Sequence, residues 1–165
     1  MRTGLTAFRR WSAMPLRLVL GYGMLAHGYA KVVNGPEHFA AALQGLGVPA
    51  PHAMAWATIG CELAGGLAVL LGAWVPLMSV PLATILLVAA ITVHARYGFS
   101  SIKLRAVTEA GPQFGPPGYE TDLLYLAGLA TLVLGGPGPW SVDALTGRPG
   151  FRALSTPHPP SAGPV

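Results

Sequence analysis

An apolar stretch, residues 15–33, carries His27 and Lys31 near its far end. Residues four apart share one helix face, so the imidazole and the ammonium point the same way. Gly23 lies on that face and leaves room for a neighbouring backbone. A helix of this length can cross a bilayer, where ionisable side chains are costly unless they meet partners or water. The stretch therefore predicts a membrane helix that contributes to a polar site.

The composition favours an integral membrane protein. Of the 165 residues, 52% are hydrophobic and only 10% are charged, whereas soluble domains carry about 25% charged residues. The net charge is +4, but the arginines lie in the tails beside apolar segments and form no mixed basic and aromatic patch. Nucleic acid is therefore not predicted as a partner.

Four apolar segments are predicted to form membrane-crossing helices, at about 15–33, 52–71, 75–97 and 119–135. The short link at 72–76 makes the second and third an antiparallel pair. Pro81 is expected to kink the third helix. In the second, the small residues Gly60, Ala64, Ala68 and Gly72 recur every fourth position, a pattern that allows membrane helices to approach closely.

The connecting segments are expected to be simple. Residues 34–51 form a loop with a short amphipathic helix at 37–46, and residues 98–118 form a second loop. A turn at 140–145 begins with Ser141 as its N-cap. The predicted domains are a basic cytoplasmic tail at 1–14, a four-helix transmembrane domain at 15–146 and a disordered Pro-rich tail at 147–165.

Four crossings place both termini on one side, and arginines set that side as the cytoplasm. The arginines concerned are Arg2, Arg9, Arg10, Arg17, Arg148 and Arg152, and Arg17 is expected to reach back to the headgroups. Trp11, Trp74 and Trp140 then fall at the inner interface, and Trp56, Tyr97 and Tyr119 at the outer one. The predicted class is all-α: an integral membrane four-helix bundle with both termini cytoplasmic. A cleaved signal peptide is the alternative for the first segment, but His27 interrupts it and three further apolar segments follow.

Ionisable groups from all four predicted helices share the outer half of the bundle. The candidate catalytic residues are His27, Lys31, Glu62, His94 and Glu120, with Asp122 close by. A contact of Glu62 with Lys31 or His27 would lower the cost of burying both groups. The alternative is that these groups only pair with one another or reach headgroups.

Other site chemistries find little support. No metal site is predicted, because His27 and His94 lie on different helices and no HxxE or HExxH spacing occurs. Cys61 is the single cysteine, so an intrachain disulfide or CxxC pair is excluded. The sequence also has no glycine-rich phosphate loop, CxxCH haem motif or nucleophile elbow.

An ordered set of short motifs runs from Leu16 to Leu145. They are Arg17-Leu-x-x-Gly21, His27-Gly28-x-x-Lys31, Gly45-x-Gly47-x-Pro49, Glu62-x-x-Gly65-Gly66 with Gly72, His94 with Gly98-Phe99, Gly118-Tyr119-Glu120, and Gly136-Pro137-Gly138 with Ser141-x-Asp143. In this order they resemble the DoxX family of small four-helix bacterial membrane proteins. The resemblance implies a multi-pass protein of the bacterial inner membrane. The family is named for a subunit linked to thiosulfate:quinone oxidation, and other members are associated with membrane oxidoreductase complexes for sulfur or oxidative-stress handling.

Three functions follow as hypotheses. The first is a redox subunit that binds a quinone: His27 or His94 hydrogen-bonds a carbonyl, Glu62 or Glu120 relays protons, and Lys31 stabilises the reduced anion. A partner then delivers electrons, since the sequence has no electron carrier of its own. The second is a non-catalytic scaffold or assembly factor that packs against a protein partner or a second copy through the small-residue row. The third, a path for protons or small solutes, is ranked last because four short helices leave little room.

Overall fold

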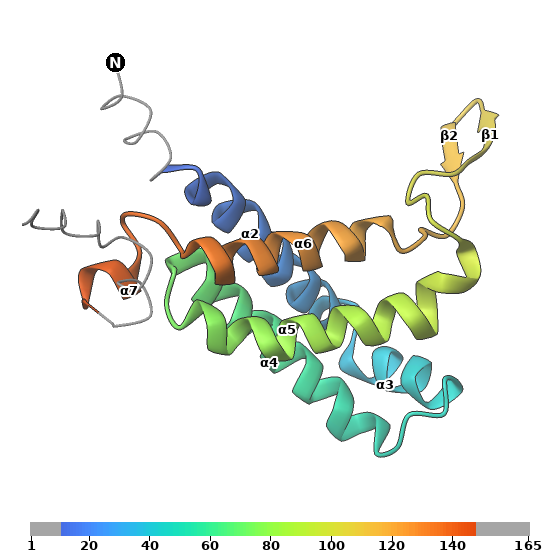
Figure 1. Cartoon of the computed structure of the whole chain (residues 1–165). Helices are drawn as coiled ribbons and strands as arrows, with labels where there is room; N and C mark the ends of the chain where they lie inside the picture. The colour runs from blue at the N-terminus through green and yellow to red at the C-terminus, as the bar shows by residue number, and fades with distance from the viewer. Residues whose placement is uncertain (1–10, 148–165) are drawn as a thin grey trace, which may run out of the picture.

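The computed structural model describes residues 11–147, and these are mostly helical (Figure 1). The long helices are α2 (Ala13–Val33), α4 (Pro51–Leu71), α5 (Val75–Ala89) and α6 (Glu120–Gly135), and the short ones are α3 (Pro36–Gly45) and α7 (Val142–Leu145). A π-helical turn, η1 (Ala90–His94), and a 3-10 turn, η2 (Ala95–Tyr97), continue α5. The four predicted helices are thus present, with ends within two residues of expectation, as is the short helix after the first one. The two predicted tails lie outside the described residues, apart from their innermost positions.

All four long helices contribute to one apolar core, and they lie side by side (Figure 1). The buried residues of that core are Leu20 and Met24 of α2, Val69 of α4, Val75, Leu82 and Leu86 of α5, and Leu129 and Leu132 of α6. The core runs along the inside of the helices, and Lys31 lies toward the end that carries α3, beside Phe39.

Glycines set the close packing of α2 against α4. A Cβ added to Gly21 would lie 2.6 Å from the backbone nitrogen of Leu70, and one added to Gly66 would lie 2.8 Å from that of Leu25. The small-residue row expected to make such a contact is packed at Gly72, where an added Cβ would lie 2.4 Å from the Cβ of Ser141, but not at Gly60. Gly60 has no atom within 4 Å of an added Cβ, because its side of α4 points away from the other helices.

The outward faces of the long helices are apolar. The exposed side chains include Leu18, Val19 and Tyr22 of α2, Trp56 and Leu67 of α4, Leu77, Val80 and Ile91 of α5–η1, and Leu124 and Leu134 of α6. The hydroxyls of Thr84, Thr92 and Thr131 donate to the carbonyl four residues earlier, at 3.0, 2.7 and 2.8 Å. Hydroxyls satisfied within their own helix suit a surround that offers no water.

Two of the described helices are long and apolar enough to cross a membrane, Pro51–Leu71 and Val75–Tyr97. Pro81 lies inside the second, as expected, and the kink predicted there stays a prediction. The observed departure from α-helical geometry comes later, at η1 and η2.

At the end of the molecule that carries α7, polar contacts join α7 to the start of α5. Ser141 caps α7, as predicted, by accepting from the backbone N–H of Ala144 at 3.1 Å. The Asp143 carboxylate accepts from the backbone N–H groups of Trp74 and Val75 at 3.0 and 3.4 Å, at the start of α5. The rings of Trp11 and Trp140 lie 6.3 Å apart. The three tryptophans predicted to share one end therefore do so.

Arg17 does not reach outward, contrary to expectation. Arg17 is only 3% exposed. Its guanidinium donates hydrogen bonds to the backbone carbonyls of Pro137 at 2.8 Å and Trp140 at 3.2 Å. Gly72 makes room for it, because a Cβ there would lie 2.7 Å from Nη1. The carbonyls beyond the end of α6 lack helical partners, so the buried guanidinium satisfies them and joins α2 to the α6–α7 link.

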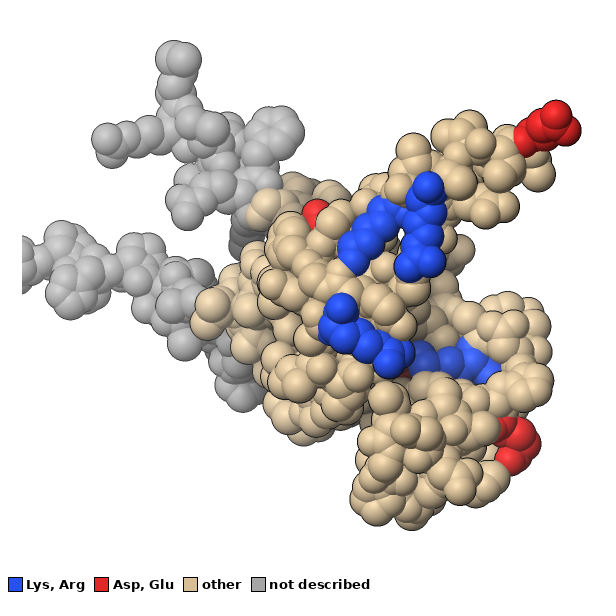
Figure 2. Space-filling view, turned by 90° about the vertical axis from the view of Figure 1, so that its right-hand side faces the viewer, with Lys and Arg blue, Asp and Glu red and all other residues tan. Residues whose placement is uncertain are grey.

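The second predicted loop contains an antiparallel hairpin that the sequence did not predict, in a chain that is otherwise mostly helical. Strand β1 (Leu104–Thr108) pairs with β2 (Gly111–Phe114), with an irregularity between Leu104 and Ala106. Gly111 takes a φ of +111° at the turn, a conformation that favours glycine. The hairpin projects sideways from the end of the helices in both Figure 1 and Figure 2.

Candidate functional site

Lys31 and Glu62 form an ion pair between α2 and α4. The ammonium lies 2.7 and 2.6 Å from the two carboxylate oxygens. Gly28 allows the approach, since a Cβ there would lie 3.2 Å from the Cβ of Glu62. Glu62 is 4% exposed, and Lys31 Nζ also lies 5.2 Å from the ring centroid of Phe39 in α3. One of the two contacts expected for Glu62 is confirmed, and it neutralises the most buried charge among the candidate residues.

His94 and Asp122 form a second pair, between η1 and the first turn of α6. The imidazole Nδ1 lies 2.5 Å from Oδ2, and the carboxylate side chain is 8% exposed. His94 is the last residue of the π-helical turn, so its position differs from the one that an unbroken α-helix would give. His94 therefore has a partner of its own.

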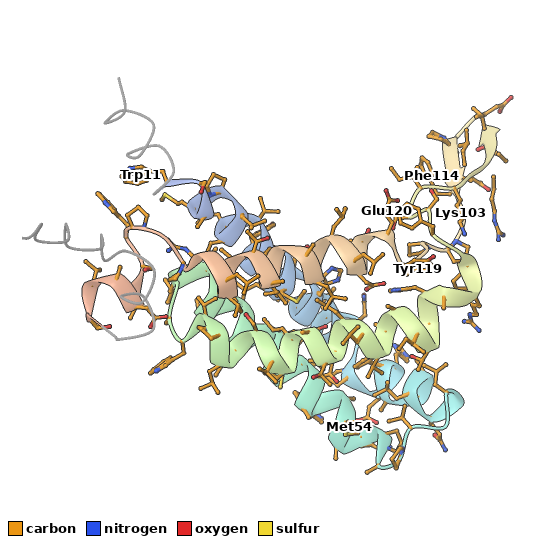
Figure 3. The ribbon with its side chains drawn as sticks, viewed as in Figure 1. Trp11, Met54, Lys103, Phe114, Tyr119 and Glu120 are labelled. Atoms are coloured by element: carbon orange, nitrogen blue, oxygen red, sulfur yellow. The ribbon has the colours of Figure 1, made fainter. Side chains whose placement is uncertain are left out.

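Glu120 faces the loop before the hairpin and not the other candidate residues. Its Oε2 accepts from the backbone N–H of Ser101 at 2.9 Å, and its own N–H donates to the carbonyl of Phe99 at 2.9 Å. In Figure 3, Glu120, Tyr119 and Lys103 lie at the base of the hairpin. Through these two hydrogen bonds Glu120 holds the loop at Phe99 and Ser101 against the start of α6.

His27 is exposed on α2, and no hydrogen bond of its imidazole is seen within residues 11–147. Its ring lies 6.0 Å from that of Tyr125 in α6, in an edge-on arrangement. Gly23 makes room for this tyrosine, since a Cβ there would lie 1.8 Å from the hydroxyl oxygen. Gly23 thus admits a side chain and not the neighbouring backbone that the sequence suggested.

The structure therefore assigns the candidate residues to separate contacts, and their predicted gathering in the outer half of the bundle stays a prediction. Lys31 and Glu62 pair, His94 pairs with Asp122, Glu120 holds the loop, and His27 is left beside Tyr125. Within the described part of the chain, no group of three or more His, Cys, Asp or Glu side chains is arranged to hold a metal ion.

Sequence reasoning missed two residues of interest, Tyr125 and the buried Arg17. Tyr125 follows Asp122 by three positions, so both lie on one face of α6; this spacing was a usable signal. Arg17 gave no such signal, because its carbonyl partners are 120 or more residues away.

Comparison with known proteins gives one match. The DoxX family model matches residues 12–95, just over half of the chain. The match covers α2 to η1 and ends before the hairpin and α6. No curated protein and no solved structure matches.

Proposed function

Because the chain belongs to the DoxX family, a family of membrane proteins, we propose that it is a quinone-linked subunit of a membrane oxidoreductase system. In this proposal α2, α4, α5 and α6 form a four-helix bundle that crosses the bacterial inner membrane, with both termini cytoplasmic. The system handles sulfur compounds or oxidative stress, and a partner protein supplies the electrons.

The apolar outward faces of all four long helices support the transmembrane placement. Exposed apolar surface in large amounts marks contact with lipid or protein, and each of the four long helices carries such side chains, among them Val19 of α2 and Leu134 of α6. Helices α2 and α6 are less apolar or shorter than the two that qualify as spans by themselves. In a bundle they cross beside α4 and α5, which cover part of their surface.

The observation that carries the quinone proposal is the exposed imidazole of His27 beside Tyr125, for which no hydrogen bond is seen within residues 11–147. A quinone headgroup is a flat apolar ring with two carbonyl acceptors, and a donor on a lipid-facing helix surface suits it. His27 donates to one carbonyl, and the Tyr125 ring borders the same side of α2. His94 and Glu120 leave the proposed binding set, since each has a partner elsewhere.

The Lys31–Glu62 pair lies one helical turn beyond His27. A bound quinone supplies two-electron chemistry coupled to two protons. Glu62 is the proposed proton acceptor and donor on the protein side, and the Lys31 ammonium holds its carboxylate in place between α2 and α4. His27 orients the headgroup and does not itself need to change charge.

The first prediction is quinone-dependent stabilisation of the purified protein. A short-chain ubiquinone or menaquinone present at about 100 times its Kd should add about 2.7 kcal/mol to the stability and raise the Tm. His27→Ala should abolish the shift, while the control His52→Ala, at the exposed pair with Glu37, should keep it. Thermal unfolding of the protein in mild detergent with native lipid measures both. An unchanged Tm with either quinone would overturn the proposal.

A non-catalytic scaffold is the second candidate, and the closed ion pairs favour it. Each pair joins two different helices, and each brings an acidic side chain against a basic one. If the pairs only hold the bundle, replacing both by apolar residues will preserve co-purification of the partner and the cellular phenotype. If quinone chemistry depends on Glu62, the phenotype will be lost while the partner is retained.

A further inference from the structure

The hairpin leaves large apolar side chains exposed at the end of the bundle. Val107 is 75% exposed, and Leu104 and Phe114 are each 58% exposed. Leu104 stands opposite Phe114 and Val107 opposite Pro112, so the apolar residues form cross-strand pairs. A two-stranded hairpin is marginal in water without a surface to pack on. These apolar pairs therefore indicate that a further surface covers the hairpin.

Basic side chains surround the same element. Segment 96–114 carries Arg96, Lys103 and Arg105 against the single acidic Glu109, which lies in the turn. The guanidinium of Arg96 stacks 4.8 Å from the ring centroid of Tyr97. Figure 2 shows Lys and Arg side chains across this end of the molecule, with the acidic group at the outer tip of the hairpin. Apolar, aromatic and basic groups in one place match the chemistry of a phospholipid interface.

The direction of the hairpin points to the bilayer around the protein's own helices. It leaves the end of α5–η2 and extends sideways, beyond the outline of the bundle, in two perpendicular views (Figure 1, Figure 2). A segment that extends sideways at the end of a membrane-crossing helix runs along the membrane surface. A segment continuing the helix axis would instead enter the water.

We propose that the hairpin lies on the bilayer surface as an interfacial anchor. Leu104, Val107 and Phe114 enter the boundary between headgroups and acyl chains, and Lys103, Arg105 and Arg96 bind lipid phosphates. The positive charge of the segment favours this occupant over a second copy, because two such hairpins would repel each other. The proposal goes beyond the quinone function and depends only on the transmembrane placement of the helices.

The test places a fluorescent label at Val107→Cys in the full chain carrying Cys61→Ala. The protein is reconstituted in phosphatidylcholine vesicles, with and without phosphatidylglycerol. Brominated lipids measure contact with the bilayer, and aqueous iodide measures contact with water. The matched control is a label at Glu37→Cys on α3, and a label at Val88→Cys on the apolar face of α5 reports the placement of the helices independently.

We expect lipid quenching at Val107 and iodide quenching at Glu37. Phosphatidylglycerol should strengthen the lipid contact. The double variant Lys103→Gln with Arg105→Gln should lower the ratio of membrane-bound to free hairpin by about fivefold for each charge removed at low salt. Iodide quenching at Val107 equal to that at Glu37 would overturn the proposal that the hairpin binds the bilayer surface, even when the label at Val88 is quenched by lipid. Protection that disappears as protein is diluted into more lipid would also overturn it, because a second copy would then be the partner.

Discussion

Among single residues, two pairs of ionisable side chains join the long helices: Lys31 with Glu62, and His94 with Asp122. Glu62 is buried in the middle of α4, and the ammonium of Lys31 lies 2.7 and 2.6 Å from its two carboxylate oxygens. Removing one member of such a pair leaves an uncompensated buried charge, whereas removing both leaves none. This asymmetry separates a structural pair from one that also performs chemistry.

We predict that Lys31→Met lowers the unfolding free energy by about 3 kcal/mol, because Glu62 then remains buried without its partner. The double variant Lys31→Met with Glu62→Met should recover most of that loss. The control Glu37→Gln changes an ion pair whose side chains are 69% and 72% exposed, and it should leave stability unchanged. Thermal unfolding in detergent, followed by circular dichroism, measures all three. A double variant no more stable than Lys31→Met would contradict the pairing.

For the helical elements, packing between α2 and α4 depends on which glycine faces inward. Gly66 lies against the backbone of Leu25, and Gly60, six residues earlier on the same helix, lies in the open. Both are glycines in an apolar helix, and the four-residue repeat in the sequence predicted that Gly60 would lie at a helix contact. The four-residue spacing of small residues describes one side of α4, but it does not say whether that side meets a helix or the surround.

We predict that Gly66→Ala destabilises the fold by about 1–3 kcal/mol, because the added methyl must push α2 away. Gly60→Ala should be neutral or slightly stabilising, since alanine has the higher helix propensity and meets no atom. The two variants form a matched pair for a Tm comparison in one detergent. Equal losses in both would mean that the exposed side of α4 is also packed, against a partner subunit.

In the whole molecule, the arrangement of the ends follows from the long helices. Trp11 lies against Trp140, so the first and last described segments share one end, while α3 and the hairpin lie at the other (Figure 1). If the four long helices cross the membrane as proposed, these two ends lie on opposite sides of the membrane. Within residues 11–147, α4 and the helix Val75–Tyr97 qualify as spans on length and apolarity alone, so the sidedness of the loops tests the other two crossings.

We predict that Asn34→Cys and Glu109→Cys, each in a Cys61→Ala background, react with a membrane-impermeant thiol reagent from the outside of intact cells. Thr146→Cys should react only after the membrane is permeabilised. All three positions are exposed, so lack of reaction reports sidedness and not burial. Labelling of Asn34 and Glu109 from opposite sides would refute the four-crossing arrangement.

The sequence by itself determined the helices and the cap at Ser141. Apolar runs separated by Gly and Pro specify where α2, α4, α5 and α6 begin and end, and a serine before a short helical turn caps it. The pairing of Lys31 with Glu62 was among the expected contacts, because both are costly in an apolar bundle and each relieves the other.

Only the tertiary structure decided which groups meet across the bundle. Whether Gly60 or Gly66 faces α2 depends on helix rotation, and the partner of His94 depends on a π-helical turn that no residue pattern announces. Arg17 is buried because carbonyls 120 and 123 residues later close over it. Helix formation is a local matter of apolar periodicity and capping, but rotation, register and long-range partners are set by the packing of all helices together.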